Sequence, residues 1–223
     1  MKKFISPLLL ILGISLILIP KLNDLYINNN SKKTLNNSYN KIKNSELQNE
    51  NINNINNLEI DDANILLTIK SLFSEKNNND IIGILYIPDI DTKLPIFNEP
   101  TNENLMTGTS IVNTNQQMGQ LNYTLIGHYS KNKSVLFGAL MDIEINSPIF
   151  ISDGSNLYKY KTVETLVVDD TEVSMISIDK YSDPTISLMT CYYSSKTGKR
   201  FFVIGKLEEV SDLDKNQYNL IFN

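Results

Sequence analysis

Hydrophobic and polar positions divide the chain into three stretches, and the first is an apolar run. Two lysines precede residues 4–19, which are almost entirely apolar, and a Pro-Lys pair closes the run. A helix of about 16 residues is ~24 Å long, against ~30 Å for a bilayer core. A cleaved signal peptide and a retained signal anchor both fit, and the lack of a small-x-small cleavage pattern favours the anchor. Residues 1–27 are then predicted to anchor a single-pass protein in the cell membrane, with a cytoplasmic N-terminus and an extracellular remainder.

The second stretch, residues 28–80, is rich in Asn and contains neither Gly nor Pro. Apolar residues show a weak helical spacing at positions 65–73. Because Asn is a poor helix former, the stretch predicts a solvated spacer with one possible short helix. Such a spacer would hold a folded domain away from a membrane.

The third stretch, residues 81–210, alternates short runs of Ile, Val, Tyr, Phe and Thr with clusters of Gly, Pro, Asn, Asp and Ser. This pattern predicts an all-β fold, and seven or eight short strands in about 130 residues indicate a sandwich or a closed barrel. Residues 134–141 could form a short helix, and residues 211–223 are interpreted as a C-terminal tail. The candidate strands are Ile82–Ile87, Lys93–Phe97, Asn122–Gly127, Pro148–Ser152, Leu157–Val168, Thr185–Cys191 and Lys199–Leu207.

Composition narrows the possible functions. The net charge of −5 lacks the basic excess that nucleic-acid binding requires. A single Cys excludes an intrachain disulfide and a multi-Cys metal site, and a single His excludes a His-rich zinc site. No metal site is therefore predicted from these residue types.

The side chains that thiol chemistry needs occur once each, as His128, Cys191 and Arg200. Cys191 ends one candidate strand and Arg200 lies at the start of the next, with Ser, Thr and Gly residues of a hairpin turn between them. A hairpin centred between Ser195 and Lys196 would place Cys191 opposite Arg200 on one face of the sheet. A slip of one residue would put the two side chains on opposite faces, so this prediction depends on the register.

Strand alternation also predicts the direction of each side chain. Cys191 points away from the face that carries Ile186 and Leu188, so it is expected at the surface if that apolar face takes the core. His128 follows Gly127 at the end of another candidate strand, which indicates the rim of a barrel. In acyl transfer, a thiolate attacks a carbonyl, a cation stabilises the oxyanion, and an imidazole carries protons.

Ordinary structural roles compete with this interpretation. A lone Cys in an apolar strand is usually a small buried hydrophobe. A lone His at a strand end or a lone Arg near a hairpin is usually a solvated surface residue. The local sequence around each of the three decides between the two interpretations.

Ser187-Leu188-Met189-Thr190-Cys191 resembles the Thr-Leu-x-Thr-Cys motif of the sortases, cysteine transpeptidases of Gram-positive surfaces, with Ser in place of the first Thr. Arg200 follows at the spacing of their catalytic Arg, and Gly127-His128 matches their catalytic His about sixty residues earlier. Residues 83–90 and 94–97 are similar to the family's opening strands. The resemblance extends over residues 81–207.

The resemblance implies a closed eight-stranded β-barrel with short helices. It also implies cleavage of a C-terminal sorting signal of the Leu-Pro-x-Thr-Gly type between Thr and Gly. Cys191 would form a thioester with the Thr carbonyl, His128 would protonate the departing amine, and Arg200 would hold the substrate and the oxyanion. Met189 and Thr190 match positions that line the substrate groove. The partners would be surface proteins with such a signal, and the acceptor a peptidoglycan precursor amine or, in a pilus-building enzyme, a pilin Lys.

The subclass expected from the resemblance is class A or class D, with class A preferred. The segment from Asp169 to Asp183 is too short for the helical insertion of class B, and no Asp-Pro-aromatic lid of class C precedes the barrel. Some class A members bind calcium near an acidic cluster such as Asp169, Asp170 and Glu172, although a solvated acidic turn is the simpler interpretation. No other cofactor is implied.

Three other hypotheses are kept beside this one. The first is a pilin-polymerising sortase. The second is an L,D-transpeptidase, whose motif carries His-Gly directly before the nucleophile, where this chain has Met189-Thr190. The third is a non-catalytic surface barrel that binds a partner.

Overall fold

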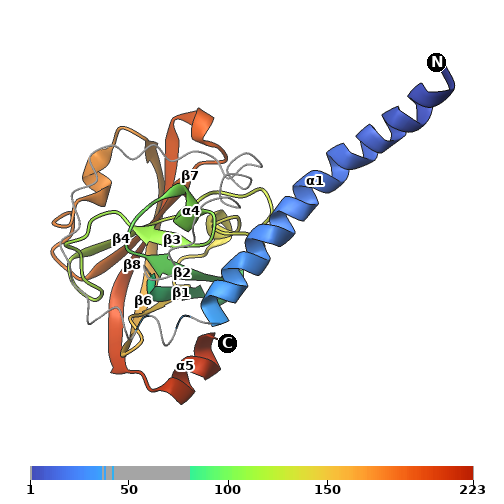
Figure 1. Ribbon diagram of the computed structural model, residues 1–223. Helices are drawn as coiled ribbons and strands as arrows, with labels where there is room; N and C mark the ends of the chain where they lie inside the picture. The colour runs from blue at the N-terminus through green and yellow to red at the C-terminus, as the bar shows by residue number, and fades with distance from the viewer. Residues whose placement is uncertain (1, 37, 39–41, 43–80, 223) are drawn as a thin grey trace.

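The structure is a computed structural model that describes residues 2–36, 38, 42 and 81–222 (Figure 1). Eight strands close into a barrel in the order β1-β2-β3-β4-β7-β8-β6-β5, which confirms the predicted closed eight-stranded barrel. The predicted helix at residues 65–73 lies outside the described residues. The strands are β1 (Ile81–Ile87), β2 (Thr92–Phe97), β3 (Thr109–Ile111), β4 (Asn122–Ile126), β5 (Pro148–Ser152), β6 (Asn156–Asp169), β7 (Thr185–Cys191) and β8 (Lys199–Asp212).

Among neighbouring strands, β2 pairs with β3 and β4 pairs with β7 in parallel, and the other pairs are antiparallel.

The described helices are short, apart from the one at the N-terminus. The α-helices are α1 (Lys2–Asn36), α4 (Asn102–Leu105) and α5 (Lys215–Phe222), and the 3-10 helices are η1 (Pro88–Ile90), η2 (Leu140–Asp142), η3 (Val173–Ile176) and η4 (Ser195–Thr197).

Two apolar clusters lie on opposite faces of the central strand β7. Ile186 and Leu188 belong to the main core, together with Leu125 of β4 and Val203 of β8. The alternate residues Met189 and Cys191 belong to a separate cluster. This division follows from the alternation of side chains along a strand, so each face of β7 packs against different elements.

Two local predictions differ from the structure. Strand β3 was not expected, because its three residues Thr109–Ile111 are too few to show alternation. The expected helix at 134–141 is instead a series of turns that ends in η2. Leu136 has a positive φ of 50°, and a Cβ at Gly138 would lie 2.1 Å from the carbonyl oxygen of Asn132, so the backbone bends too sharply for a helix.

Helix α1 continues to Asn36, into the stretch expected to be a spacer, and its C-terminal part lies against the barrel (Figure 1). Ile27 is buried in the main core, and Asn30 Nδ2 donates to Thr107 Oγ1 over 2.9 Å. Asn132 Nδ2 donates to Asp24 Oδ2 over 3.0 Å. The end of the helix is therefore part of the folded domain.

The prediction of a single-pass membrane protein is not supported. Within the residues that the structure describes, none of the helices is both long enough and apolar enough to cross a membrane. The prediction rested on the apolar run alone, and that run is shorter, at ~24 Å, than a ~30 Å bilayer core. The assignment of residues 1–27 as a membrane anchor is corrected accordingly.

Within the stretch interpreted as a C-terminal tail, Lys215–Phe222 form helix α5. Tyr218 and Phe222 of α5 are buried beside Leu35 of α1 and Ile84 of β1. The hydroxyl groups of Tyr218 and Ser38 are hydrogen-bonded at 2.7 Å. The C-terminal part of α1 and helix α5 therefore pack together against β1 and β2 (Figure 1).

This packing predicts a large cost for Tyr218→Ala. Tyr218 is 1% exposed, whereas Leu220 on the same helix is 86% exposed. Removal of a buried aromatic ring costs about 3–5 kcal/mol, and a surface substitution costs within about 0.5 kcal/mol. We expect urea unfolding to show this difference between Tyr218→Ala and the control Leu220→Ala. Equal free energies of unfolding for the two variants would contradict the docked position of α5.

Candidate active site

Cys191 and Arg200 are directly paired across β7 and β8. The antiparallel register matches Met189 with Phe202, Thr190 with Phe201, and Cys191 with Arg200. The Tyr192 amide donates to the Lys199 carbonyl over 3.0 Å and closes the hairpin. The predicted register is confirmed, so the sulfur and the guanidinium lie on the same face of the sheet.

His128 comes to the other side of Cys191 through the parallel pairing of β4 with β7. Ile126 is matched with Met189, and the Gly127 amide donates to the Met189 carbonyl over 3.1 Å. His128 lies two residues beyond Ile126, the end of β4, and continuing this register past the strand end places it level with Cys191. His128, Cys191 and Arg200, which follow one another across the end of β4, β7 and β8, are called the row below.

The turn after β4 fixes the backbone of His128. A Cβ at Gly127 would lie 2.7 Å from the ring of the buried Phe137, so only glycine fits at this position. The Phe137 amide donates to the His128 carbonyl over 3.1 Å. His128 itself is fully buried, whereas the sequence indicated a position on the barrel rim.

Cys191 is also buried, at 2% exposed, which differs from its expected place at the surface. Its neighbours in the cluster include Met189, Phe202 and Met175. Met175 belongs to η3 in the β6–β7 segment, residues 170–184, so this segment covers the face that β7 turns away from the core. Alternation along β7 was predicted correctly, but the covering segment could not be inferred from it.

The two predicted substrate-binding residues occupy different faces. Met189 is buried in the cluster with Cys191, on the face where a substrate would lie. Thr190 points the other way, and its Oγ1 donates to the Gly127 carbonyl over 2.9 Å. The position of Thr190 suits a bond between β4 and β7 rather than contact with a ligand.

Arg200 is mostly shielded, with 15% of its side chain exposed, and pairs with a carboxylate of the β6–β7 segment. Its Nη2 lies 3.8 Å from Asp170 Oδ2, and Nη1 donates to the Lys199 carbonyl over 3.3 Å. The neighbouring Asp169 lies 2.9 Å from Lys199 Nζ, and this hydrogen bond raises the pKa of Lys199. Two carboxylates of the proposed calcium cluster thus have basic partners. In the described ranges, no three His, Cys, Asp or Glu side chains are grouped so as to hold a metal ion.

Tyrosines around the row were not singled out from the sequence. Tyr129 follows His128, and its ring meets that of Tyr193 edge-on with centroids 6.1 Å apart. Tyr193 has a positive φ of 61° and is 57% exposed, so the β7–β8 turn presents an aromatic ring to solvent. Burial, followed by the charge of Glu164, raises the pKa of Tyr181 at the cluster edge. In the sequence, only the position of Tyr129 directly after His128 indicated that a tyrosine lies near the candidate site.

A sortase domain family model matches residues 85–208, which is more than half of the chain. The chain belongs to the sortase family. Sortase A of Listeria monocytogenes is 37% identical over 142 residues, which cover 64% of this chain and 63% of that protein. Sortase A of Bacillus anthracis is 32% identical over 133 residues, covering 59% and 61% of the two chains. The alignments thus span less than two thirds of the length of these curated relatives.

The fold of this sortase is similar to that of a solved relative. The crystal structure of Listeria monocytogenes sortase A superposes with a TM-score of 0.61 at 36% identity, covering 64% of this chain and 97% of that one. The residues that the family model matches include His128, Cys191 and Arg200.

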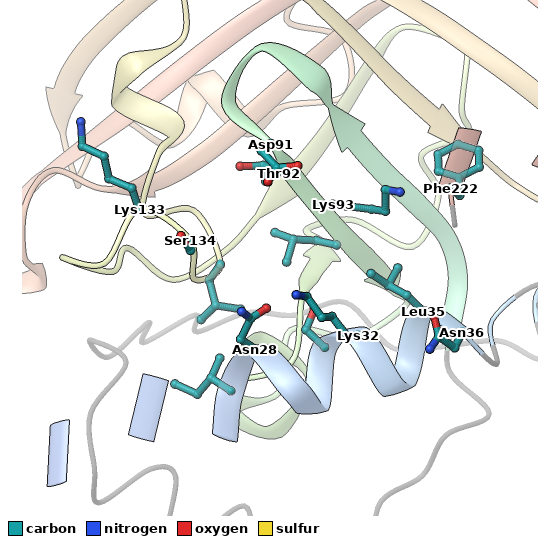
Figure 2. Close-up of a pocket in the computed structure, with 14 residues that line it drawn as sticks. Asn28, Lys32, Leu35, Asn36, Asp91, Thr92, Lys93, Lys133, Ser134 and Phe222 are labelled. Atoms are coloured by element: carbon teal, nitrogen blue, oxygen red, sulfur yellow. The ribbon is translucent and has the colours of Figure 1, made fainter. Parts of the chain in front are cut away.

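A cavity of about 520 Å³ lies elsewhere, between α1 and β2 (Figure 2). Its walls include Lys32, Lys93 and Lys133, but none of the three residues of the row. Lys133 Nζ is 2.8 Å from Asp142, and Lys93 Nζ lies 4.9 Å from the centroid of the Tyr86 ring. Figure 2 shows these two ammonium groups pointing in different directions, so they do not converge on one ligand.

The hydrogen bond from Thr190 to the Gly127 carbonyl can be tested by protein stability, without measuring catalytic activity. Thr190→Val removes the hydroxyl and leaves the buried Gly127 carbonyl without this partner, which costs about 1–3 kcal/mol. We expect urea unfolding to show this loss, with Thr171→Val at an exposed position of the β6–β7 segment as the control. An unchanged stability for Thr190→Val would mean that this bond does not hold β4 to β7.

Proposed function

We propose that this sortase is a cysteine transpeptidase that cleaves a Leu-Pro-x-Thr-Gly-like signal between Thr and Gly and transfers the Thr carbonyl to an amine. The row formed by His128, Cys191 and Arg200 is the observation that carries the proposal. A nucleophile and a permanent cation are paired across β7 and β8, and the proton carrier follows the end of β4, the other neighbour of β7. These three groups can together form and resolve a thioester.

In the first step, the Cys191 thiolate attacks the Thr carbonyl carbon and forms a C–S bond. Negative charge develops on the carbonyl oxygen, where the Arg200 guanidinium provides up to two hydrogen bonds. The C–N bond to Gly then breaks, and His128 donates a proton to the departing amine. A thioester on Cys191 and a free Gly amino terminus result.

In the second step, an acceptor amine attacks the thioester carbonyl. His128 removes a proton from that amine, the C–S bond breaks, and Cys191 regains its thiolate. Arg200 stabilises the second oxyanion as it did the first. The products are a new amide and an enzyme ready for another donor.

Arg200 must exchange partners for this chemistry. In the structure its Nη2 is 3.8 Å from Asp170, a separation longer than that of a charge-assisted hydrogen bond. A substrate oxyanion at about 2.8 Å would therefore compete effectively for the guanidinium. Met189 fits the proposal as part of the groove wall, while Thr190 contributes by holding β4 to β7.

The donor is proposed to be a surface protein with a C-terminal sorting signal, and the acceptor a peptidoglycan precursor amine. The two relatives above carry the name Sortase A, which supports a class A enzyme over a pilin-polymerising one. An L,D-transpeptidase is disfavoured by membership of the sortase family. A non-catalytic barrel would have no need of the three-residue row.

Replacement of the nucleophile tests the mechanism directly. We expect the full chain to cleave a fluorogenic Leu-Pro-x-Thr-Gly peptide, and Cys191→Ala to lose this cleavage completely, because the only thiol is gone. Mass spectrometry of the wild type with the peptide should detect the thioester on Cys191. Persistent cleavage by Cys191→Ala would contradict the mechanism.

The bidentate role of the guanidinium is tested by Arg200→Lys. Lys keeps the charge but loses the planar fork, and loss of one oxyanion donor lowers kcat by about 10²–10³-fold. Lys199→Arg, one residue away on the other face, is the matched control and should retain activity. Near-normal kcat for Arg200→Lys would show that charge alone suffices.

A further inference from the structure

The β6–β7 segment reaches the face of Cys191 through η3. Met175 is 6% exposed and packs in the cluster that holds Met189 and Cys191, while Ile176 and Tyr181 lie at the edge of that cluster. The position of this segment therefore decides how much of Cys191 is covered and which apolar surface lies next to it.

One buried amide attaches η3 to the barrel. Asn122, the first residue of β4, is fully buried, and its Nδ2 donates to the carbonyls of Met175 over 3.1 Å and Ser177 over 2.9 Å. Its backbone amide donates to the Ile178 carbonyl over 3.0 Å. Ser187 Oγ on β7 donates to Asn122 Oδ1 over 2.7 Å, so both ends of the side-chain amide are engaged.

These bonds hold the middle of the segment. Within the part of the chain that the structure describes, the hydrogen bonds from residues 173–182 to a barrel strand all end on Asn122. The two ends of the segment are held separately, by Asp170 with Arg200 and by Asp183 with Lys206. The other polar contacts of this stretch are local, such as Lys180 Nζ with Ser174 Oγ. A buried amide with every donor and acceptor satisfied favours one geometry over its alternatives.

We propose that Asn122 is a positioning residue that holds η3 over Cys191 and so forms one wall of the groove for the apolar part of the donor peptide. This inference rests on the proposed function for the identity of the ligand. Asn122 touches neither Cys191 nor the reacting carbonyl in this scheme. It acts through the place it gives to Met175 and Ile176.

Asn122→Asp is the most direct test, because it preserves size and the acceptor for Ser187 but removes both donors. A carboxylate oxygen would then face the Met175 or Ser177 carbonyl, so the segment should detach. Because Cys191 is the only thiol, alkylation by iodoacetamide reports its cover without any substrate. We expect alkylation of the native Asn122→Asp protein to be about tenfold faster than that of the wild type.

Peptide kinetics give the second measurement. We expect KM for a Leu-Pro-x-Thr-Gly peptide to rise about tenfold, with kcat changed less than about threefold, because the row on β4, β7 and β8 is intact. A general loss of folding would instead lower kcat in proportion to the folded fraction and leave KM unchanged. Asn115→Asp makes the same charge change at an exposed site before β4, and should match the wild type in both measurements.

A milder variant covers the case in which Asn122→Asp does not fold. Ser187→Ala removes the donor to Asn122 Oδ1 but leaves both bonds to the segment possible, so alkylation and KM should shift in the same direction by a smaller factor. Unchanged alkylation in both variants overturns the proposal. Faster alkylation with unchanged KM also overturns it, because η3 would then not border the donor groove. If wild-type protein cleaves no peptide, the proposed function fails, and the alkylation rates alone still decide whether Asn122 holds η3 over Cys191.

Discussion

The structure depends on the pairing of β7 with two different neighbours. Its parallel partner β4 and its antiparallel partner β8 fix the register on both sides, and all seven residues of β7 are buried. Because side chains alternate with a period of two, a slip of one residue on either side would turn a partner of Cys191 to the opposite face. The row of His128, Cys191 and Arg200 is a direct product of these two registers. Hydrogen bonds at the strand ends, from Gly127 to Met189 and from Thr190 to Gly127, hold the register where the chemistry would occur.

Burial of the site follows from what covers β7. One face contributes Ile186 and Leu188 to the barrel core, and the other lies under the β6–β7 segment. A thiol in an apolar cluster is protected from solvent, but a peptide can reach it only if this cover and the pair formed by Asp170 and Arg200 give way. The hydrogen bonds of Asn122 to the carbonyls of Met175 and Ser177 place the cover, and the 3.8 Å separation of Arg200 from Asp170 leaves the guanidinium able to change partners. The same segment thus covers Cys191 and contacts the guanidinium of Arg200.

The sequence pattern predicted some elements of the fold to the residue and missed others. Strands β5 and β7 begin and end at the predicted residues, because turn residues bound strongly β-forming runs there. The three residues of β3 carry no pattern of their own and form a strand only because β2 and β4 lie on either side. Helix α1 runs to Asn36 despite its run of Asn residues, since Ile27 and Leu35 find apolar partners on the barrel and beside α5. The apolar run at its start suggested a membrane span that the described residues do not support.

The sequence by itself determined the all-β class, the residues of the candidate site and the pairing of Cys191 with Arg200, because a short hairpin is local and its turn sets the register. The sequence predicted the position of His128 less firmly, because β4 and β7 are parallel and their pairing joins residues about sixty positions apart. Only the tertiary structure decided that His128 and Cys191 are buried, that Thr190 bonds to Gly127, and that Asn122 holds η3. Each of these depends on which segment packs over a given face, and that choice is made by long-range contacts rather than by local periodicity.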